Sequence, residues 1–345
     1  MLKPEESPNL AIENIKKRQN AVIRKHSIQQ LLSKQFTSFE ELVDAARYWK
    51  AEFRQISASC RKPKVRQLIA GNTLLSTGWF GCHVDQRGQT PGQMRTIALP
   101  HIDCSEFRWF GYRIDRPVLL VFPLGGEIDA ISKPGFHVTT MSIPAQILDE
   151  YCERNFQSSS RKVIGADERV LQVKPDVIEG LMKSLKFVSR LSRLHGDTPG
   201  RSNVVASFEA QLLDTLFQNS HSTVLKSKIP GRSGRNSVLD SALEYIENNQ
   251  RDVVYIHELC AAIRVPERTL RAVFQHELGI SPKRFLLGRK MYGIHRELWN
   301  SDPTDSRVSD LANAWGFWHM GQFAKHYRSF FGELPNDTLK KAGKV

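Results

Sequence analysis

One pattern occurs twice in the last third of the chain, and it constrains the fold more than any other feature. Each copy contains a short apolar helix, a turn, a longer amphipathic helix, a glycine and a proline. Leu259 and Leu311, in the two short helices, are 52 residues apart. The later positions are 53 apart, as one extra residue in the second turn would explain: Leu270 and Phe323, Phe274 and Tyr327, Gly279 and Gly332, Pro282 and Pro335. Two such helix-turn-helix units could place their second helices in neighbouring major-groove segments about 34 Å apart. The repeat therefore predicts a sequence-specific DNA-binding protein.

The composition indicates the class of protein. A length of 345 residues favours two domains, with room for a helical connector. The hydrophobic fraction of 40% and the charged fraction of 25% are typical of a soluble globular protein. No apolar run approaches the roughly 18–20 residues of a membrane span, and the N-terminus has no signal-peptide core. The five cysteines are scattered and odd in number, which suits reduced thiols. We therefore expect a cytoplasmic, nucleoid-associated protein without membrane contact.

The positive charge is unevenly distributed. The whole chain carries a formal charge of +13, but residues 236–345 contain 15 Lys and Arg against 13 Asp and Glu, which leaves only +2. The excess lies elsewhere, for example at Arg54, Arg61, Lys62, Lys64 and Arg66. The net charge therefore supports DNA binding only weakly, and the repeat carries the argument.

The first 165 residues are expected to form a β domain with a helical leader. Residues 1–36 have the apolar spacing of a basic, helix-rich leader, and Ser38 with Glu41 forms the capping-box signature of a short helix. Short apolar or alternating runs then predict strands at about 67–70, 73–80, 95–99, 107–114, 118–122, 127–131 and 137–143. Gly, Pro and Asp between these runs favour a small β-barrel or jelly roll of the cupin-like kind. Pro144 is expected to open a flanking helix.

Residues 166–235 are expected to form a helical connector and a linker. Apolar residues recur there at spacings of three and four: Ile178, Leu181, Met182, Leu185, Val188, Leu191 and Leu194. This stripe could be a dimer seam, or it could pack against its own β domain. A second helix is predicted through 204–216, and Ser222–Asn236 has the composition of a flexible linker. The predicted fold is thus α+β, with an N-terminal β-barrel domain flanked by helices and an all-α double helix-turn-helix domain over 236–345.

The second helix of each repeat offers candidate DNA-contacting residues. In the first unit, the outward positions are Glu267, Arg268, Arg271, Ala272 and Gln275. Arg268 and Arg271 are the best candidates to bind guanine O6 and N7, although contact with phosphate alone is the alternative. Glu267 could accept a hydrogen bond from cytosine N4 or cap the helix. In the second unit, the outward positions are His319, Met320, Gly321, Gln322, Ala324, Lys325 and Arg328. Lys325 and Arg328 are expected on phosphate.

A long helix is expected between the units, from Phe285 to Trp299. Its basic residues Lys283, Arg284, Arg289 and Lys290 could flank the DNA backbone. Gly293 lies inside this helix, where glycine costs about 1 kcal/mol relative to alanine. Close packing or a bend is therefore expected at that position.

These features resemble the AraC/XylS family of bacterial transcription regulators over about 238–340. The matching residues are Leu270-x3-Phe274-x4-Gly279-Ile-Ser-Pro282, Arg289-Lys290-Met291, Asp310-Leu311-Ala312, Gly316-Phe317 and Phe323-x3-Tyr327-x4-Gly332-x2-Pro335. Trp315-Gly-Phe-Trp-His319 and Phe331-Gly-Glu-Leu-Pro335 look closer to the subgroup of ethanolamine-operon regulators.

The resemblance also implies partners and base-reading positions. The positions fall on Arg268, Arg271, Ala272, Met320, Gly321, Ala324 and Lys325. The sequence departs from the family at Arg264, where a turn glycine is common, and at Ala272, often a long polar residue. A double-stranded DNA operator and RNA polymerase are the implied macromolecular partners. The N-terminal domain is implied to bind a small effector or a partner and to mediate dimerisation.

The β domain offers a candidate effector pocket. Aromatic residues with an arginine could line a site for an aromatic or anionic ligand, or they could simply be core. The candidates are Trp79, Phe107, Trp109, Tyr112 and Arg113.

Catalytic and metal sites are not predicted. Cys82-His83 and His101-x2-Cys104 offer four zinc ligands, but they lack a CxxC spacing, and adjacent strand residues point to opposite faces. Cys60 lacks the companion cysteines of the methyl-accepting repair regulators. Phosphate loops, nucleophile elbows and HExxH motifs are absent from the sequence. We expect no cofactor, no metal and no enzymatic activity.

The sequence therefore predicts a transcription regulator, most simply an activator that responds to a small molecule bound by its N-terminal domain. The alternative is a regulator whose N-terminal domain is a protein-docking and dimerisation module without a small ligand.

Overall fold

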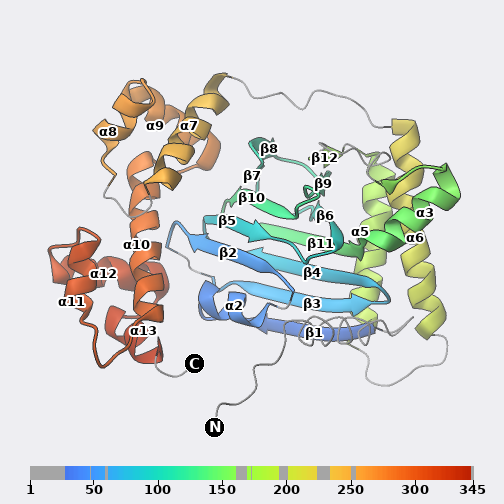
Figure 1. Ribbon diagram of the computed structural model, residues 1–345, viewed down its shortest axis with the longest axis horizontal. Helices are drawn as coiled ribbons and strands as arrows, with labels where there is room; N and C mark the ends of the chain where they lie inside the picture. Colours follow the sequence, from blue (N-terminus) through green and yellow to red (C-terminus); the bar gives the residue numbers. More distant parts are fainter. Residues whose placement is uncertain are drawn as a thin grey trace, which may run out of the picture.

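The computed structural model describes residues 28–46, 48–58, 61–160, 169–171, 173–193, 201–223, 234–249 and 254–342. A β-rich N-terminal half with helices along one side stands beside an all-helical C-terminal half (Figure 1). This arrangement confirms the predicted fold class. No described helix is long and apolar enough to cross a membrane.

The strands form two antiparallel sheets. The larger sheet has the order β1-β3-β4-β11-β6-β9-β12 and the smaller has the order β2-β5-β10-β7-β8. The strands of the larger sheet are β1 (Ile28–Gln35), β3 (Lys64–Ala70), β4 (Thr73–Phe80), β6 (Met94–Pro100), β9 (Leu119–Val121), β11 (Phe136–Pro144) and β12 (Val170–Leu171). The strands of the smaller sheet are β2 (Lys50–Gln55), β5 (Val84–Gln89), β7 (Phe107–Trp109), β8 (Tyr112–Ile114) and β10 (Glu127–Ser132). In the described residues no strand pairing joins the sheets, so the domain is a two-sheet sandwich and not a closed barrel.

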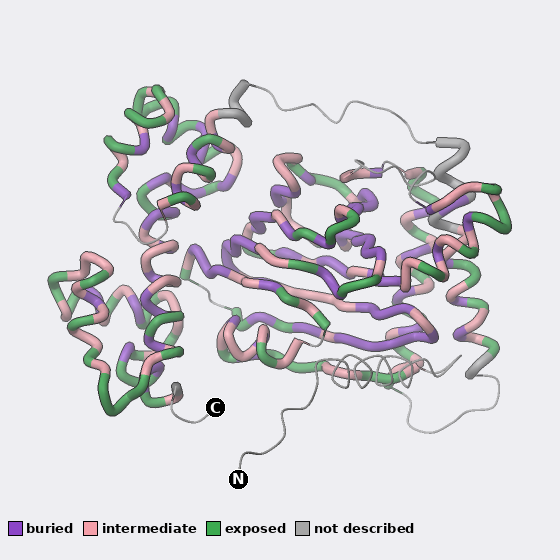
Figure 2. The backbone as a smooth tube through the Cα atoms, in the orientation of Figure 1, coloured by how far each residue is buried: buried purple, intermediate pink, exposed green. Residues whose placement is uncertain are grey.

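Alternation along the strands creates two separate cores. Side chains such as Phe80, Phe107, Trp109, Phe136 and Val138 fill the space between the sheets. The residues of the larger sheet that point the other way pack against helices α3 (Ala145–Phe156), α5 (Pro175–Leu191) and α6 (Arg201–Thr223). The strands are accordingly buried along most of their length (Figure 2).

The apolar stripe of the connector belongs to this second core. Val177, Leu181, Leu185 and Val188 of α5 are buried against the sheet and α6. Of the two readings of the stripe, the structure therefore favours packing against its own domain, because a dimer seam would leave these residues open in one chain. Leu194 and the linker residues 224–233 lie outside the described residues.

The leader was predicted wrongly where the structure describes it. Residues 28–35 form strand β1, which pairs with β3, whereas a helical pattern was expected. The pairing shifts between Gln30 and Leu32, so Leu31 is an extra residue in a β-bulge. A bulge adds one residue to the period of two, and apolar residues then recur at spacings that resemble a helix. Residues 1–27 lie outside the described part of the chain.

The C-terminal half consists of seven described helices. They are α7 (Gly234–Asn248), α8 (Ile256–Ala262), α9 (Glu267–Leu278), α10 (Pro282–Asn300), α11 (Val308–Ala314), α12 (Met320–Phe331) and α13 (Pro335–Ala342). Helix α10 runs between a cluster formed by α7–α9 and a cluster formed by α11–α13 (Figure 1). Each cluster has its own apolar core.

Candidate DNA-binding interface and regulatory cavity

Helices α8 and α9 form the first helix-turn-helix unit. Leu259 of α8 packs with Leu270, Val273 and Phe274 of α9 in one buried core. Helix α9 ends at Gly279, whose φ of 72° is left-handed and suits glycine. The inward residues alternate with period three to four, so the remaining positions of α9 must face outward.

The outward positions of α9 are exposed as the sequence predicted. They are Glu267, Arg268, Arg271, Ala272 and Gln275. Arg271 Nη2 lies 2.7 Å from Glu267 Oε1, an exposed i,i+4 ion pair. Such a pair is worth little in water, about 0.3–0.5 kcal/mol, so it aligns Arg271 without preventing it from contacting DNA. Glu267 thus has a local role as the partner of Arg271.

The turn of the first unit contains an arginine in a glycine-like conformation. Arg264 has a φ of 56°, and Gly316, 52 residues later, has a φ of 77°. The two turns therefore share one backbone shape. Arg264 stands where a turn glycine is common in the AraC/XylS family, but the backbone geometry of the turn is the one that glycine would adopt.

Helices α11 and α12 form the second unit on the same plan. Ala312, Phe323 and Tyr327 are buried in its core, and α12 ends at Gly332 with a φ of 76°. The Tyr327 hydroxyl lies 2.5 Å from Nδ1 of the fully buried His295 on α10. These contacts fix α12 to the connecting helix.

The outward positions of α12 match the prediction except at Met320 and Ala324, which are both half-buried. His319, Gln322, Lys325 and Arg328 are exposed. Met320 is half-buried and packs against the second core, so in this structure its side chain presents less surface than expected. Gly321 is exposed, with open space around its Cα.

Helix α10 sets the distance between the units. Its 19 residues give a length of about 28 Å at 1.5 Å per residue, which is comparable with one turn of B-DNA. A Cβ on Gly293 would lie 2.1 Å from the Trp315 ring. The predicted close packing at Gly293 is thereby confirmed, and it locks α10 to the turn of the second unit.

The basic residues of α10 do not all face away from the protein, and Arg289 corrects the prediction. Arg289 Nη1 lies 2.6 Å from Asp85 Oδ2 on β5, and its Nη2 lies 2.8 Å from Glu247 Oε2 on α7. Arg289 therefore joins the two halves of the chain and is not presented to a DNA backbone. Lys290 is half-buried over the Tyr255 ring, and burial lowers its pKa. Lys283 and Arg284 are exposed as expected.

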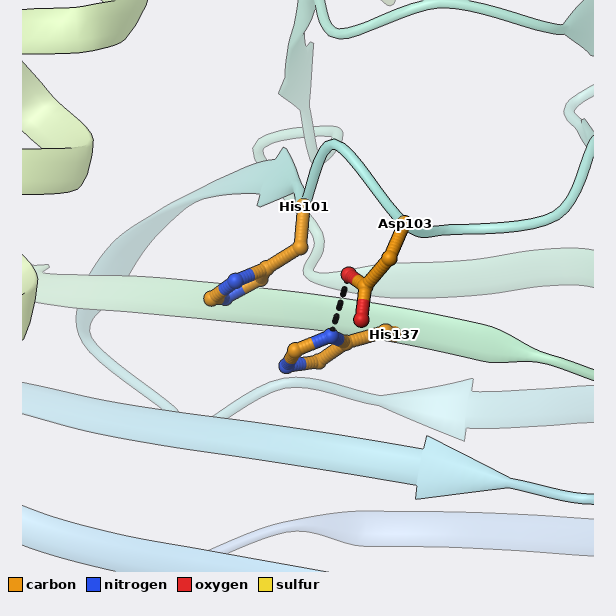
Figure 3. A group of neighbouring side chains, drawn as sticks. All are labelled: His101, Asp103 and His137. Atoms are coloured by element: carbon orange, nitrogen blue, oxygen red, sulfur yellow. Dashed lines mark hydrogen bonds and ion pairs between the residues drawn. The ribbon is translucent and has the colours of Figure 1, made fainter.

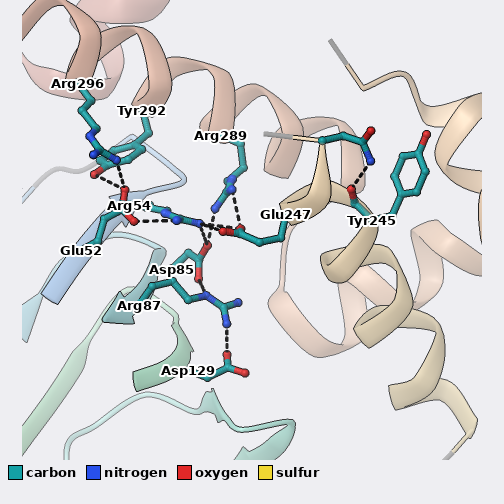
Figure 4. A network of polar contacts seen from close by, with 11 residues as sticks. Glu52, Arg54, Asp85, Arg87, Asp129, Tyr245, Glu247, Arg289, Tyr292 and Arg296 are labelled. Atoms are coloured by element: carbon teal, nitrogen blue, oxygen red, sulfur yellow. Dashed lines mark hydrogen bonds and ion pairs between the residues drawn. The ribbon is translucent and has the colours of Figure 1, made fainter. Parts of the chain in front are cut away.

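Arg289 is part of an ion-pair network between the β domain and the helical half (Figure 4). Arg54 of β2 lies 2.7 Å from Glu247 and 2.7 Å from Glu52, and Arg296 of α10 lies 2.7 Å from Glu52. Asp85, at 2% side-chain exposure, also pairs with Arg87. Burial alone lowers the pKa of Arg54, but the hydrogen bond to Glu52 and the charge of Asp85 raise it. Arg54, one of the basic residues that give the chain its positive charge, therefore forms ion pairs at this interface.

Further contacts attach the β domain to both helix-turn-helix units. His83 Nε2 donates to the Leu278 carbonyl at the end of α9 over 3.0 Å, and Arg108 pairs with Asp240 and Glu277. Burial lowers the pKa of His83. Gln55 Nε2 donates to the Phe330 carbonyl of α12 over 2.6 Å. The smaller sheet, together with His83 just before β5, thus contacts both units.

The α10 surface also approaches the β domain closely. A Cβ on Gly288 would lie 2.0 Å from the Ile56 carbonyl oxygen. Only glycine allows this contact, because any other residue would force the backbones apart. Sequence reasoning missed Gly288, although a glycine inside a helical pattern was the available signal.

A cavity of about 90 Å³ lies between the two sheets. Its walls are mostly aromatic and aliphatic and include Trp49, Phe53, Gln86, Phe107, Trp109 and Phe122. Helix α2 (Phe39–Ala45) contributes Leu42. Trp49 Nε1 and Gln86 Nε2 are buried and have no hydrogen-bond partner among the described residues.

Two of the five predicted pocket residues line this cavity. Phe107 and Trp109 do so, whereas the other three lie elsewhere. Trp79 points to the opposite face of β4, against His137. Tyr112 packs at the edge of the inter-sheet core, and the exposed Arg113 pairs with Glu106. Strand alternation explains Trp79, since its neighbour Phe80 faces the cavity.

The comparisons with known proteins agree with this architecture. Residues 259–341 match a helix-turn-helix domain family. The chain is 32% identical over 240 residues to XylDLEGF operon transcriptional activator 3 of Pseudomonas putida, covering 68% of this chain and 69% of that protein. It is 30% identical over 270 residues to the probable thc operon regulatory protein of Rhodococcus erythropolis, covering 76% and 75% respectively.

One solved structure has similar sequence over about a third of the chain. The crystal structure of a probable AraC family transcriptional regulator from Rhodopseudomonas palustris CGA009 aligns with 31% of this chain and 97% of its own at 34% identity, with a TM-score of 0.28. The Pseudomonas putida and Rhodococcus erythropolis relatives are each matched over more than two thirds of their own length, so the sequence similarity extends beyond the helix-turn-helix region. The chain belongs to the AraC/XylS family of transcription regulators.

Proposed function

We propose that this protein is a transcriptional activator whose affinity for an operator is controlled by a small, mainly apolar molecule between its two sheets. The observation that carries the proposal is the cavity between the sheets, where Trp49 Nε1 and Gln86 Nε2 are buried donors without a partner among the described residues. The smaller sheet, which forms one wall of this cavity, also contacts the DNA-binding half. The activator role is supported by the operon activator that the chain resembles. RNA polymerase is the partner that an activator needs, and the cytoplasm is where it would work.

The base-reading residues are proposed to be Arg268 and Arg271 in the first unit. Both are exposed on the N-terminal turns of α9, the part of a recognition helix that reaches base edges. Glu267 and Gln275 flank them. In the second unit, His319 and Gln322 lie at the start of α12, and Lys325 and Arg328 follow as phosphate contacts. The closer likeness to ethanolamine-operon regulators rests on residues 315–324 and 331–335 alone.

The chemistry of the cavity defines the effector. The walls include no charged side chain, so a neutral ligand fits better than an anion. Trp49 Nε1 and Gln86 Nε2 are both donors, and an acceptor such as a carbonyl oxygen would satisfy them. The cavity is smaller than the roughly 150 Å³ that holds a benzene molecule. A single-ring ligand would therefore push the sheets apart as it enters.

Such a displacement of the smaller sheet would be passed to the DNA-binding half by individual β-strands, each of which contacts both the cavity and a helix of that half. On β2, Phe53 lines the cavity and the next residue, Arg54, pairs with Glu247 of α7. On β5, Gln86 lines the cavity and Asp85 pairs with Arg289. On β7, Phe107 lines the cavity and Arg108 pairs with Asp240. Successive strand residues point to opposite faces, so each strand carries one side chain to the ligand and the next to the DNA-binding half.

Thermal unfolding with matched ligands tests the proposal. Acetophenone has one ring and one carbonyl acceptor, and ethylbenzene has a similar shape without the acceptor. Acetophenone should raise the unfolding temperature saturably and more than ethylbenzene, and Trp49→Phe and Gln86→Leu should each remove this difference. Trp79→Phe, outside the cavity, is the control and should keep it. If neither compound nor a wider panel of neutral single-ring ligands stabilises the protein, the effector part of the proposal is wrong.

The second candidate is a docking and dimerisation module without a small ligand. Phe187 on α5 favours it, because 51% of this residue is exposed beside α6. A homodimer formed there would shift its mass with concentration, and Phe187→Ser would abolish the shift. Dimerisation together with no ligand response would support this second function.

A further inference from the structure

Two histidines and an aspartate meet at one end of the larger sheet (Figure 3). His101 follows strand β6, Asp103 lies in the loop after it, and His137 is on β11. The backbone fixes this meeting, because His101 N donates to the His137 carbonyl over 2.9 Å. The three side chains lie on the face of the sheet away from the inter-sheet cavity, since Phe136 and Val138 of β11 face that cavity.

The ligand atoms of the cluster are close together. His137 Nδ1 lies 2.7 Å from Asp103 Oδ1, and the two imidazole rings stack at 3.7 Å with an angle of 11° between them. One nitrogen or oxygen from each side chain lies within 4.8 Å of the other two. Ligand atoms around a tetrahedral zinc ion, at 2.0–2.1 Å from the metal, are about 3.3 Å apart. Rearrangement of these side chains would therefore bring the three groups to metal-binding distances.

Burial disfavours the protonated form of both imidazoles. Burial lowers the pKa of His101 to about 4, with a further contribution from His137, and burial also lowers the pKa of His137. Lys186 of α5 adds positive charge near His101. A neutral imidazole has a free lone pair, which is the requirement for a metal ligand.

The rings are held by few bonds. His137 Nε2 is buried and has no hydrogen-bond partner in the described part of the chain. The contact of His137 Nδ1 with Asp103 is the one that an ion would replace. His101 Nε2 is held by Thr139 Oγ1 over 2.7 Å. Stacked rings cannot both aim a lone pair at one ion, so His101 would leave Thr139 and rotate out of the stack.

We propose that His101, Asp103 and His137 form a binding site for one divalent transition metal ion of the Zn²⁺ class, with water as the remaining ligand. Two imidazoles and a carboxylate suit such an ion, whereas Mg²⁺ and Ca²⁺ prefer oxygen ligands. The bound ion would tie the loop after β6 to β11. This inference is independent of the effector and of DNA binding.

The neighbouring thiol is excluded from the site. Cys104 Sγ accepts from His137 N over 3.2 Å and contacts the Ser105 carbonyl oxygen at 3.3 Å. Cys104 is not part of the group of ligand atoms that lie within 4.8 Å of one another. The four zinc ligands considered in the sequence are therefore not assembled, because Cys82 lies in the inter-sheet core and His83 contacts the helical half.

Cobalt binding to the full-length protein tests this site. Protein stripped with a chelator is titrated with Co²⁺, whose visible absorption reports the ligand geometry, and Zn²⁺ affinity is measured by competition. We expect one ion per chain, no thiolate-to-cobalt charge-transfer band, and a saturable rise in unfolding temperature. His101→Gln and Asp103→Asn should each weaken binding at least tenfold. Asp103 is exposed, so its substitution leaves the fold intact.

The control keeps the test specific. His276 of α9 is an exposed histidine that lies 3.0 Å from Glu277, a similar histidine–carboxylate pair. His276→Gln should leave metal affinity unchanged. Binding that survives in both His101→Gln and Asp103→Asn, or that falls equally in His276→Gln, would overturn the proposed site, as would the absence of stoichiometric binding to the wild type.

Discussion

Arg271, which we propose as a base-reading residue, forms an exposed ion pair that costs little to break. Its guanidinium is aligned by Glu267 on the same face of α9 and stays exposed. Arg271→Ala should weaken binding to the specific operator by about 1–3 kcal/mol and relax the preference at one base position. Binding constants on the operator and on a random duplex, at fixed salt, provide the measurement.

Arg154→Ala is the matched control for this substitution. Arg154 forms the same kind of exposed i,i+4 pair with Glu150, on α3 in the N-terminal half. It should leave operator binding unchanged. An equal loss for Arg271→Ala on operator and random DNA would identify a phosphate contact and refute base reading by this side chain.

Arg264 is strained in the turn of the first unit. A left-handed conformation costs an ordinary residue about 1–2 kcal/mol, and Gly316 avoids this cost in the second unit. Arg264→Gly should therefore raise the free energy of unfolding by up to about 1 kcal/mol, less the extra entropy of glycine in the unfolded chain. Thermal unfolding measures the effect. A loss of stability would mean that contacts of the arginine outweigh the strain.

At the residue scale, the sequence allowed the exposure of side chains to be predicted, but not their ion-pair partners. The period of α9 correctly indicates that Arg268 and Arg271 face outward. The same reasoning placed Arg289 on the outside of α10, but it lies against Asp85, 204 residues earlier in the chain. A helical period shows which side of a helix is polar. That side is not always exposed to solvent, because a buried ion pair with a distant strand also requires polar residues there.

At the scale of elements, the contact of α10 with the end of β2 depends on Gly288. Gly288→Ala should force the two backbones apart and destabilise the docking of the two halves by about 1–3 kcal/mol, as overpacking commonly does. Hydrogen exchange at residues 50–56 and 282–300 should increase.

Gly180→Ala on α5 is the control for Gly288→Ala. It has no neighbouring atom within 4 Å of the added Cβ, so alanine there should stabilise the helix by about 0.5–1 kcal/mol. Unchanged hydrogen exchange in Gly288→Ala would show that the two halves are not held together at this contact.

The elements themselves were predictable where the sequence alternates. The segment Thr73–Phe80 was predicted to the residue, whereas β2 and β5 were missed. Strand β5 contains Asp85, Gln86 and Arg87, because one face meets charged residues of the helical half. The predicted strand at 107–114 is a hairpin, in which Phe110 and Gly111 both have positive φ values. The glycine was the signal for that turn.

At the scale of the whole molecule, the sequence predicted a β-rich N-terminal part and a helical C-terminal part, and it did not predict how the two dock. The repeat indicated two helix-turn-helix units, and both are present. The network of Arg54, Asp85, Glu247 and Arg289 joins strands and helices that are far apart in sequence, and composition cannot reveal such pairing. The formal charge of the helical half gave no sign that its connecting helix faces a β domain.

The most direct test of this account is a footprint on DNA fragments selected from the host genome by the full-length protein. If both helix-turn-helix units, joined by α10, bind DNA independently, the footprint should contain two short protected segments about one helical turn apart. Arg271→Ala should weaken one box, and Lys325→Ala together with Arg328→Ala the other. A single box, or diffuse protection that salt removes equally from every fragment, would contradict the claim that both units bind DNA.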